Sequence, residues 1–309
     1  MPKLIMEALA FDSGKASGVN VEMANNSSNC YIESALVSLA SAKRENSECD
    51  AVLYCNEPVG SKYAEVAERF GVGVKSAPFD DYVFEPGLPW RPAYYKLCAL
   101  AHAVGCGRYD SVCLMDSDTW NSAPISELLT SRGGVFMVEL ESRLSSADRI
   151  SMERTYDELG LDWDQTLFPT CWGGEFVCGD AGSLGLLLDG CKDTYARMRK
   201  QGVSSKRGDE FLLYASANRA GFPAFSANAY VRRVWTGRYF TPCRHESYAV
   251  LHFPAEKNYA FPKAWKRLER GELVDTETFV GWCGLRPSKR PLDLAWAMVR
   301  VAQKARSQA

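Results

Sequence analysis

The chain has 309 residues, of which 46% are hydrophobic, so it is long enough to bury a sizeable core in one large domain or two small ones. Its formal net charge of −2 gives no broad positive field, and we therefore expect no nucleic-acid partner. The sequence has no run of about 18 apolar residues, so we predict no membrane-spanning helix. The first residues are typical of a strand and not of a signal peptide.

The sequence has eleven cysteines, and no two of them form a Cys-x-x-Cys pair. A structural zinc site typically uses closely spaced thiolates, and a small secreted scaffold typically uses an even set of cysteines. Neither pattern is present. We therefore expect free thiols and a reducing, cytoplasmic location.

Strand and helix patterns alternate through the first half of the chain. They predict strands at 3–11, 51–55, 72–74 and 111–115, with helices at 31–43, 61–70 and between Pro92 and Gly105. The second half is less regular and predicts strands at 135–140, 175–178 and 248–253, with helices at 144–160, 182–200 and 209–220. This alternation is typical of the α/β class, with a mostly parallel sheet covered by helices.

Two carboxylates follow directly on the predicted strand at 111–115, in the segment Asp116-Ser117-Asp118. Open α/β sheets bind ligands at the carboxyl ends of their strands. Two converging carboxylates repel each other unless a cation lies between them, and a hard divalent cation can also bridge phosphate oxygens. The alternative to a metal site is that Asp116 and Asp118 are capping residues ahead of the turn at 121–124. A second copy, Asp162-Trp163-Asp164, follows no strand, and we interpret it as solvated surface.

A histidine that could complete this site stands near the end of the predicted strand at 248–253. His252 would add an imidazole nitrogen to two carboxylates, a ligand set that manganese accepts, and Lys257 could neutralise phosphate beside it. The alternative for His252 is a hydrogen-bonded core histidine. Glu139 and Glu141 also close an apolar strand, but we expect a solvent-exposed edge there.

Several segments together resemble glycosyltransferase family 8, namely Tyr94-Tyr95-Lys96-Leu97, Arg108-Tyr109-Asp110-Ser111-Val112 and Met115-Asp116-Ser117-Asp118-Thr119. The resemblance implies the A-type glycosyltransferase fold, a Rossmann-like, mixed and mostly parallel sheet flanked by helices. It implies metal ligation by Asp116 and Asp118, with Ser117 and Asp118 near the donor sugar and ribose. Lys96 stands where the family usually has arginine and would reach the donor phosphates or sugar.

Two later segments extend the resemblance. Trp172-Gly173-Gly174-Glu175-Phe176 is similar to the segment that lines the donor sugar and acceptor, which implies substrate contacts for Trp172, Gly174 and Glu175. Gly208-Asp209-Glu210 is similar to the family's Asp-Gln motif, with Glu210 in place of glutamine. The similarity implies that Asp209, or Glu210, is catalytic, by stabilising charge on the sugar or orienting the acceptor hydroxyl. The alternative for Asp209 is a carboxylate that satisfies N–H groups at a helix N-terminus.

The last and the first segments of the similar region imply residues that bind the metal and the nucleotide, respectively. Residues 251–265 are similar to the family's His-x-x-Gly…Lys-Pro-Trp ending, although Ala255 and Ala264 replace its glycine and proline. This similarity implies that His252 is the third metal ligand and that Lys257 lies on the pyrophosphate. Near the N-terminus, the residues similar to those that cradle the nucleotide base are Phe11, Asp12 and Tyr31.

The resemblance therefore implies a hexosyltransferase that uses Mn²⁺ or Mg²⁺. Its donor would be a nucleotide-diphosphate sugar, such as a UDP-sugar, and its acceptor a glycan or lipid-linked molecule, with retention of configuration. One alternative is a sugar-phosphate nucleotidyltransferase, which needs a Gly-rich loop after the first strand that residues 14–18 match poorly. Another is a non-catalytic nucleotide-sugar or carbohydrate-binding module on the same fold.

We divide the chain into a catalytic domain at 1–265 and a basic helical extension at 266–309. The extension contains a predicted amphipathic helix at about 292–304. This helix would either cap the catalytic domain or lie on an anionic membrane surface.

Overall fold

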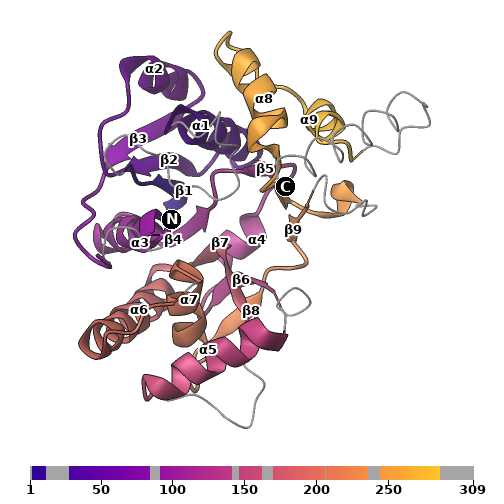
Figure 1. The fold of residues 1–309 in the computed structure, drawn as a ribbon. Helices are drawn as coiled ribbons and strands as arrows, with labels where there is room; N and C mark the ends of the chain where they lie inside the picture. The colour runs from indigo at the N-terminus through magenta and orange to yellow at the C-terminus, as the bar shows by residue number, and fades with distance from the viewer. Residues whose placement is uncertain are drawn as a thin grey trace, which may run out of the picture.

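The computed structural model describes residues 2–11, 28–83, 91–140, 146–161, 170–205, 207–235 and 244–285. Its central feature is a seven-stranded sheet in the order β3-β2-β1-β4-β7-β6-β8 (Figure 1). In chain order these strands are β1 Lys3–Leu9, β2 Asp50–Cys55, β3 Val72–Ser76, β4 Ser111–Met115, β6 Val135–Glu139, β7 Trp172–Asp180 and β8 Ala224–Ser226.

Only one of the seven strands runs against the others. β1 pairs in parallel with β2 and β4, β2 with β3, and β6 with β8, whereas β7 pairs antiparallel with both β4 and β6. The predicted mixed, mostly parallel sheet flanked by helices is therefore confirmed. Because β7 is reversed, its first residues lie beside the carboxyl end of β4.

Helices pack against this sheet, as the near-continuous apolar strands require. α1 (Ser28–Glu45) packs on β1, β2 and β3 and contacts α2 (Ser61–Arg69), whereas α3 (Tyr95–Gly105) packs on β1 and β4 and contacts α6. The remaining helices of this part are α4 (Ser126–Thr130), α5 (Ser146–Glu158), α6 (Ala181–Gln201) and α7 (Asp209–Ala217). α7 packs on β7 and α6, and α5 reaches α7 through the ring contact of Tyr156 with Tyr214.

A second, three-stranded sheet is joined to the first by the acidic segment. β5 (Thr119–Asn121) follows β4 after residues 116–118 and pairs antiparallel with β10 (Val250–His252), which in turn pairs in parallel with β9 (Val231–Arg233). The hydroxyls of Ser38 in α1 and Thr119 in β5 are hydrogen-bonded at 2.7 Å. Asp116 and Asp118 thus lie in the link between two sheets.

Of the described residues beyond 265, those of α9 pack on this second sheet. α8 (Ala260–Leu268) contacts α1, and α9 (Thr276–Trp282) places Phe279 in a stacked contact with Trp120 of β5, with ring centroids 4.1 Å apart. Trp120 also donates a hydrogen bond to Thr276. The boundary that we predict after residue 265 falls within α8, and the division into two domains stays a prediction.

The predicted elements mostly agree with the observed ones, and the largest differences concern strands. β7 extends over nine residues instead of the four predicted at 175–178, and β8 and β9 had not been predicted. The second acidic copy at 162–164, Glu141 and the basic helix at 292–304 lie outside the described residues.

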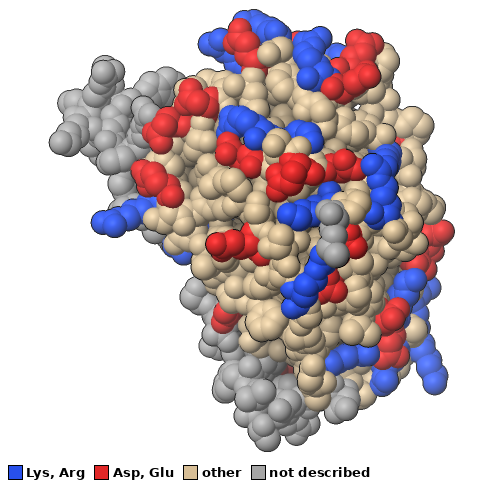
Figure 2. Space-filling model, turned by 180° about the vertical axis from the view of Figure 1, so that it is seen from behind, with Lys and Arg blue, Asp and Glu red and all other residues tan. Residues whose placement is uncertain are grey.

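Ten cysteines lie among the described residues, and no disulfide joins any two of them. In the part of the chain that the structure covers, no helix combines the length and apolar character needed to cross a membrane. On the face shown in Figure 2, acidic and basic side chains are interspersed, so neither sign forms a broad field there. The cytoplasmic location stays a prediction.

We expect Phe279→Ala to destabilise the protein, because the ring is fully buried against Trp120, Phe253 and Phe261. Truncating such a side chain costs about 3–5 kcal/mol, which should lower the melting temperature by roughly 6 °C or more. Thermal unfolding followed by circular dichroism measures the change. Leu186→Ala is the matched control, since Leu186 is 64% exposed, and an equal loss in both variants would contradict the packing of α9 on β5.

Candidate metal centre

Three side chains that could ligate a metal ion converge where β4 ends. Asp116, Asp118 and His252 each offer one ligand atom, and these atoms all lie within 4.8 Å of one another. His252 is the register partner of Thr119, so the pairing of β10 with β5 brings the imidazole next to the acidic segment. Its Nε2 lies 3.2 Å from Asp118 Oδ1 and 3.8 Å from Asp116 Oδ2.

This group fits a hard divalent cation. Asp118 Oδ1 is buried and makes no hydrogen bond apart from its ion-pair contact with His252 Nε2, an atom that would ligate the same ion. Two carboxylates and one imidazole form a donor set that suits Mn²⁺, and Mg²⁺ is also bound through carboxylate oxygens. The structure therefore brings the three predicted ligands together, while the identity of the ion stays a prediction.

Two lysines neutralise the carboxylates of this group. Lys257 forms an ion pair with Asp118, and Lys96 Nζ lies 2.9 Å from both Asp116 Oδ1 and Asp209 Oδ2. Burial would raise the pKa of Asp118, but Lys257 and then His252 hold it well below its usual range. Burial would lower the pKa of Lys96, but Asp116 and Asp209 raise it. Both predicted lysines thus reach the acidic residues.

The imidazole carries a positive charge at neutral pH in this setting. Burial would lower the pKa of His252, but the neighbouring Asp118 carboxylate raises it to about 9. A metal ion at Nε2 would displace this proton, because the ligating form of histidine is neutral.

Asp209 lies on the far side of Lys96 from Asp116. It is the first residue of α7, and its carboxylate forms an ion pair with Lys96. Burial raises the pKa of Asp209, and Lys96 opposes this rise. Gly174 makes room for the pair, because a Cβ there would lie 2.5 Å from Asp209 Oδ2. Asp209 thus lies in contact with Lys96, and both its catalytic role and the capping alternative stay predictions.

Glu175 is fully buried, in contrast to its expected place against a substrate. Its Oε2 lies 2.6 Å from the Arg233 guanidinium, and its Oε1 lies 3.7 Å from His252 Nδ1. Burial would raise the pKa of Glu175, but Arg233 and then His252 lower it to about 2. Trp172, which lies three residues earlier on the same strand, is also buried. Substrate contacts of both side chains stay predictions.

Glu210 follows Asp209 and lies among charges of both signs. One of its oxygens is 3.6 Å from Arg233, and the other is 3.6 Å from Arg207. Burial, followed by the charge of Glu175, raises the pKa of Glu210 to about 7. Glu210 can therefore exchange a proton near neutral pH.

The residues predicted for the nucleotide base lie at the end of β1 and on α1. The backbone N–H of Phe11 donates to Asn56 Oδ1, and Asn56 Nδ2 donates to the Phe11 carbonyl. Tyr31 is half-buried, and its ring centre lies 5.7 Å from Lys257 Nζ. Ser117 is half-buried in the turn between Asp116 and Asp118. Asp12 lies outside the described residues.

Three residues in and around the candidate site had not been predicted from the sequence. Arg233 stands on the short strand β9, which the pattern of residues 221–235 had not indicated. Asn56 follows β2 and belongs to no motif that we recognised in the sequence. Glu7 is fully buried in β1, and burial raises its pKa well above the usual value. A single acid inside the apolar run 4–9 was a signal for Glu7 that could have been followed.

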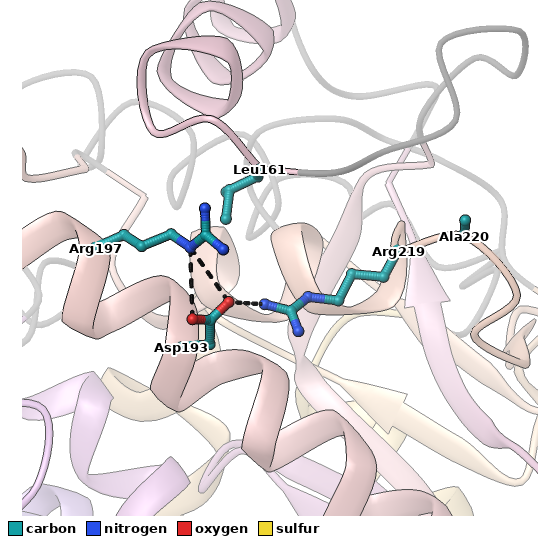
Figure 3. Close-up of a pocket in the computed structure, with 5 residues that line it drawn as sticks. All are labelled: Leu161, Asp193, Arg197, Arg219 and Ala220. Atoms are coloured by element: carbon teal, nitrogen blue, oxygen red, sulfur yellow. Dashed lines mark hydrogen bonds and ion pairs between the residues drawn. The ribbon is translucent and has the colours of Figure 1, made fainter.

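A pocket of about 270 Å³ lies elsewhere, against α6 (Figure 3). Its polar lining is an ion-paired group in which Asp193 contacts both Arg197 and Arg219. Leu161 and Ala220 complete its lining. None of these five residues was predicted for the metal centre.

Comparison with models of known protein families gives no match, and a search of curated proteins finds no significant match either.

We expect Asp116→Asn to weaken Mn²⁺ binding by at least about 100-fold, since loss of one ligand should cost no less than loss of its supporting contacts. The fold should persist, because Asp116 is 28% exposed and Lys96 keeps its contact with Asp209. Isothermal titration calorimetry measures the affinity. Asp189→Asn, which changes an exposed acid on α6, is the control, and wild-type affinity in Asp116→Asn would contradict the assigned ligands.

We expect Glu210→Gln to stabilise the protein at pH 8 but not at pH 5. The pKa of Glu210 is about 7 in the folded state and about 4.3 in an unfolded chain, so its favourable contribution is present below the lower value and is lost as pH rises through 7. Taking about 1 kcal/mol for this loss, the variant should melt about 2–4 °C higher than the wild type at pH 8. Glu158→Gln, an exposed substitution, should show no such pH dependence, and a pH-independent effect of Glu210→Gln would contradict the raised pKa.

Proposed function

We propose that the protein is a metal-dependent glycosyltransferase of the A-type fold that uses a nucleotide-diphosphate sugar as donor. The observation that carries this proposal is the convergence of Asp116, Asp118 and His252 at the carboxyl edge of a mostly parallel sheet, with Lys257 beside them. This edge is where open α/β sheets bind nucleotides. The resemblance of residues 94–119 to glycosyltransferase family 8 supports the same reading.

Asp116, Asp118 and His252 would hold Mn²⁺ or Mg²⁺, which when bound supplies positive charge to a diphosphate leaving group. Lys257 forms an ion pair with Asp118. An ion on Asp118 would take over that neutralisation and leave the ammonium group of Lys257 to bind a phosphate oxygen. The ion pair with Asp118 thus supports a phosphate-binding role for Lys257.

Asp209 and Glu210 stand on the other side of the centre and are proposed to act on the sugar. Lys96 connects Asp209 to Asp116, so the sugar-facing carboxylate and the metal ligand share one cation. A carboxylate at this place can stabilise positive charge that develops on the anomeric carbon or orient an acceptor hydroxyl. Gly174 leaves the space that Asp209 and Lys96 occupy.

Phe11 and Tyr31 are proposed to flank the nucleotide base, since Asn56 fixes the backbone of Phe11 and Tyr31 lies close to Lys257. In this arrangement the base would contact Tyr31, and the diphosphate would contact the neighbouring side chain of Lys257. UDP is our proposed nucleotide, a glycan or lipid-linked molecule our proposed acceptor, and retention our proposed stereochemical outcome. These three assignments rest on the family resemblance.

We expect a nucleoside diphosphate or its sugar conjugate to stabilise the protein only when Mn²⁺ is present. At about 100 times the dissociation constant, a ligand adds about 2.7 kcal/mol, which should raise the melting temperature by about 5 °C. A thermal-shift panel of nucleoside diphosphates and nucleotide-sugars, with Mn²⁺ or with a chelator, measures this effect. Turnover of the stabilising donor should fall at least about 100-fold in Asp116→Asn and be unchanged in Asp189→Asn.

Full turnover in Asp116→Asn would contradict the proposal. Metal-dependent release of pyrophosphate from a nucleoside triphosphate and a sugar phosphate would instead favour a nucleotidyltransferase. Binding of a nucleotide-sugar without metal dependence and without turnover would favour a non-catalytic module.

A further inference from the structure

The side chain of Glu175 lies against the imidazole nitrogen of His252 that faces away from the acidic residues. His252 Nε2 approaches Asp118 and Asp116, whereas Nδ1 lies 3.7 Å from Glu175 Oε1. The side chains of Glu175 and His252 are 0% and 4% exposed, so water has little access to the space between them. The two nitrogens of this ring therefore face two different sets of carboxylates.

The backbone fixes this arrangement through three strands. His252 in β10 and Arg233 in β9 are register partners, and the N–H of Val234 donates to the His252 carbonyl at 2.7 Å. Glu175 in β7 accepts a hydrogen bond at its carbonyl from the N–H of Asp116, at 3.0 Å. Its backbone thus holds one predicted metal ligand while its side chain lies against another.

Arg233 and Gly173 hold the carboxylate of Glu175 in place. The guanidinium of Arg233 lies 2.6 Å from Oε2, so the buried carboxylate has a cationic partner. Gly173 is two residues before Glu175 on the same face of the strand. A Cβ at Gly173 would lie 2.0 Å from Oε2, so the carboxylate occupies the space of the missing side chain.

A metal-ligating histidine typically donates the hydrogen of its other ring nitrogen to a carboxylate, which fixes the tautomer and the ring orientation. His252 Nδ1 and Glu175 Oε1 are buried and lack a hydrogen-bond partner, so they can supply this contact to each other by a small movement. We infer that Glu175 is a positioning residue that holds His252 with its hydrogen on Nδ1 and its Nε2 directed at the metal. This inference rests on the metal site of the proposed function.

The test compares two variants of the full chain by isothermal titration with Mn²⁺. Glu175→Leu combined with Arg233→Met removes the ion pair without leaving either charge alone in the interior, and should weaken Mn²⁺ binding by about 100-fold. Glu175→Gln keeps the shape of the side chain and an oxygen that can accept from Nδ1, so it should weaken binding by only about tenfold.

A second readout reports on the histidine itself. The chain has three histidines, so the ¹⁵N spectrum of its imidazole rings is simple to assign. With diamagnetic Cd²⁺ bound at Nε2, the Nδ1 hydrogen of wild-type His252 should resonate downfield, because it is donated to the Glu175 carboxylate, and in the double variant it should move upfield. A residue that merely stabilised the fold would leave this Nδ1–H resonance unchanged.

Glu277→Gln is the matched control, because Glu277 Oε1 lies 3.2 Å from His245 Nε2 in a histidine–carboxylate pair that is not at the metal site. It should leave Mn²⁺ affinity unchanged. Wild-type affinity in Glu175→Gln, or a wild-type Nδ1–H resonance in the double variant, would overturn the positioning role alone. Failure of the wild type to bind Mn²⁺ would overturn the proposed metal site as well, so the two failures are distinguishable.

Discussion

Charge balance among buried carboxylates at the carboxyl end of β4 is the constraint on which the candidate site depends. Asp118, Glu175 and Asp209 are each at most 4% exposed. An isolated charge in such a place costs several kcal/mol, so each carboxylate needs a cation in contact. Lys257 faces Asp118, Arg233 faces Glu175, and Lys96 faces Asp209. The site is therefore a set of matched pairs in which a divalent ion would rearrange the partners of Asp116 and Asp118.

The sheet topology explains why residues so far apart in the chain can form these pairs. β7 is the one reversed strand in the seven-stranded sheet, so its first residues meet the end of β4 and bring Gly174 and Glu175 beside Asp116. β5 continues from the acidic segment into the second sheet, and β10 and β9 then add His252 and Arg233. Two consecutive glycines at the start of β7 leave room for one carboxylate each. A larger side chain at either position would displace a charged group.

The local parts of this site could be predicted from the sequence, and the long-range contacts could not. A buried strand ending in Asp116 and Asp118 has a local pattern, and so does the strand that carries His252 shortly before Lys257. The family resemblance added Lys96 and Asp209. The contact of Glu175 with Arg233 joins strands 58 residues apart, and β9 is a three-residue strand without a clear period. Glu175 was accordingly expected at a substrate, whereas the fold turns its side chain into the interior. Periodicity predicts which residues are buried, but not which charged groups meet there.

The most direct measurement of the central claim is anomalous X-ray scattering at the manganese edge from crystals grown with Mn²⁺ and UDP. The account predicts a single strong peak in contact with Asp116, Asp118 and His252, with the diphosphate bound to the same ion and to Lys257. A peak at other residues, or UDP bound with no ion at these three side chains, would contradict it.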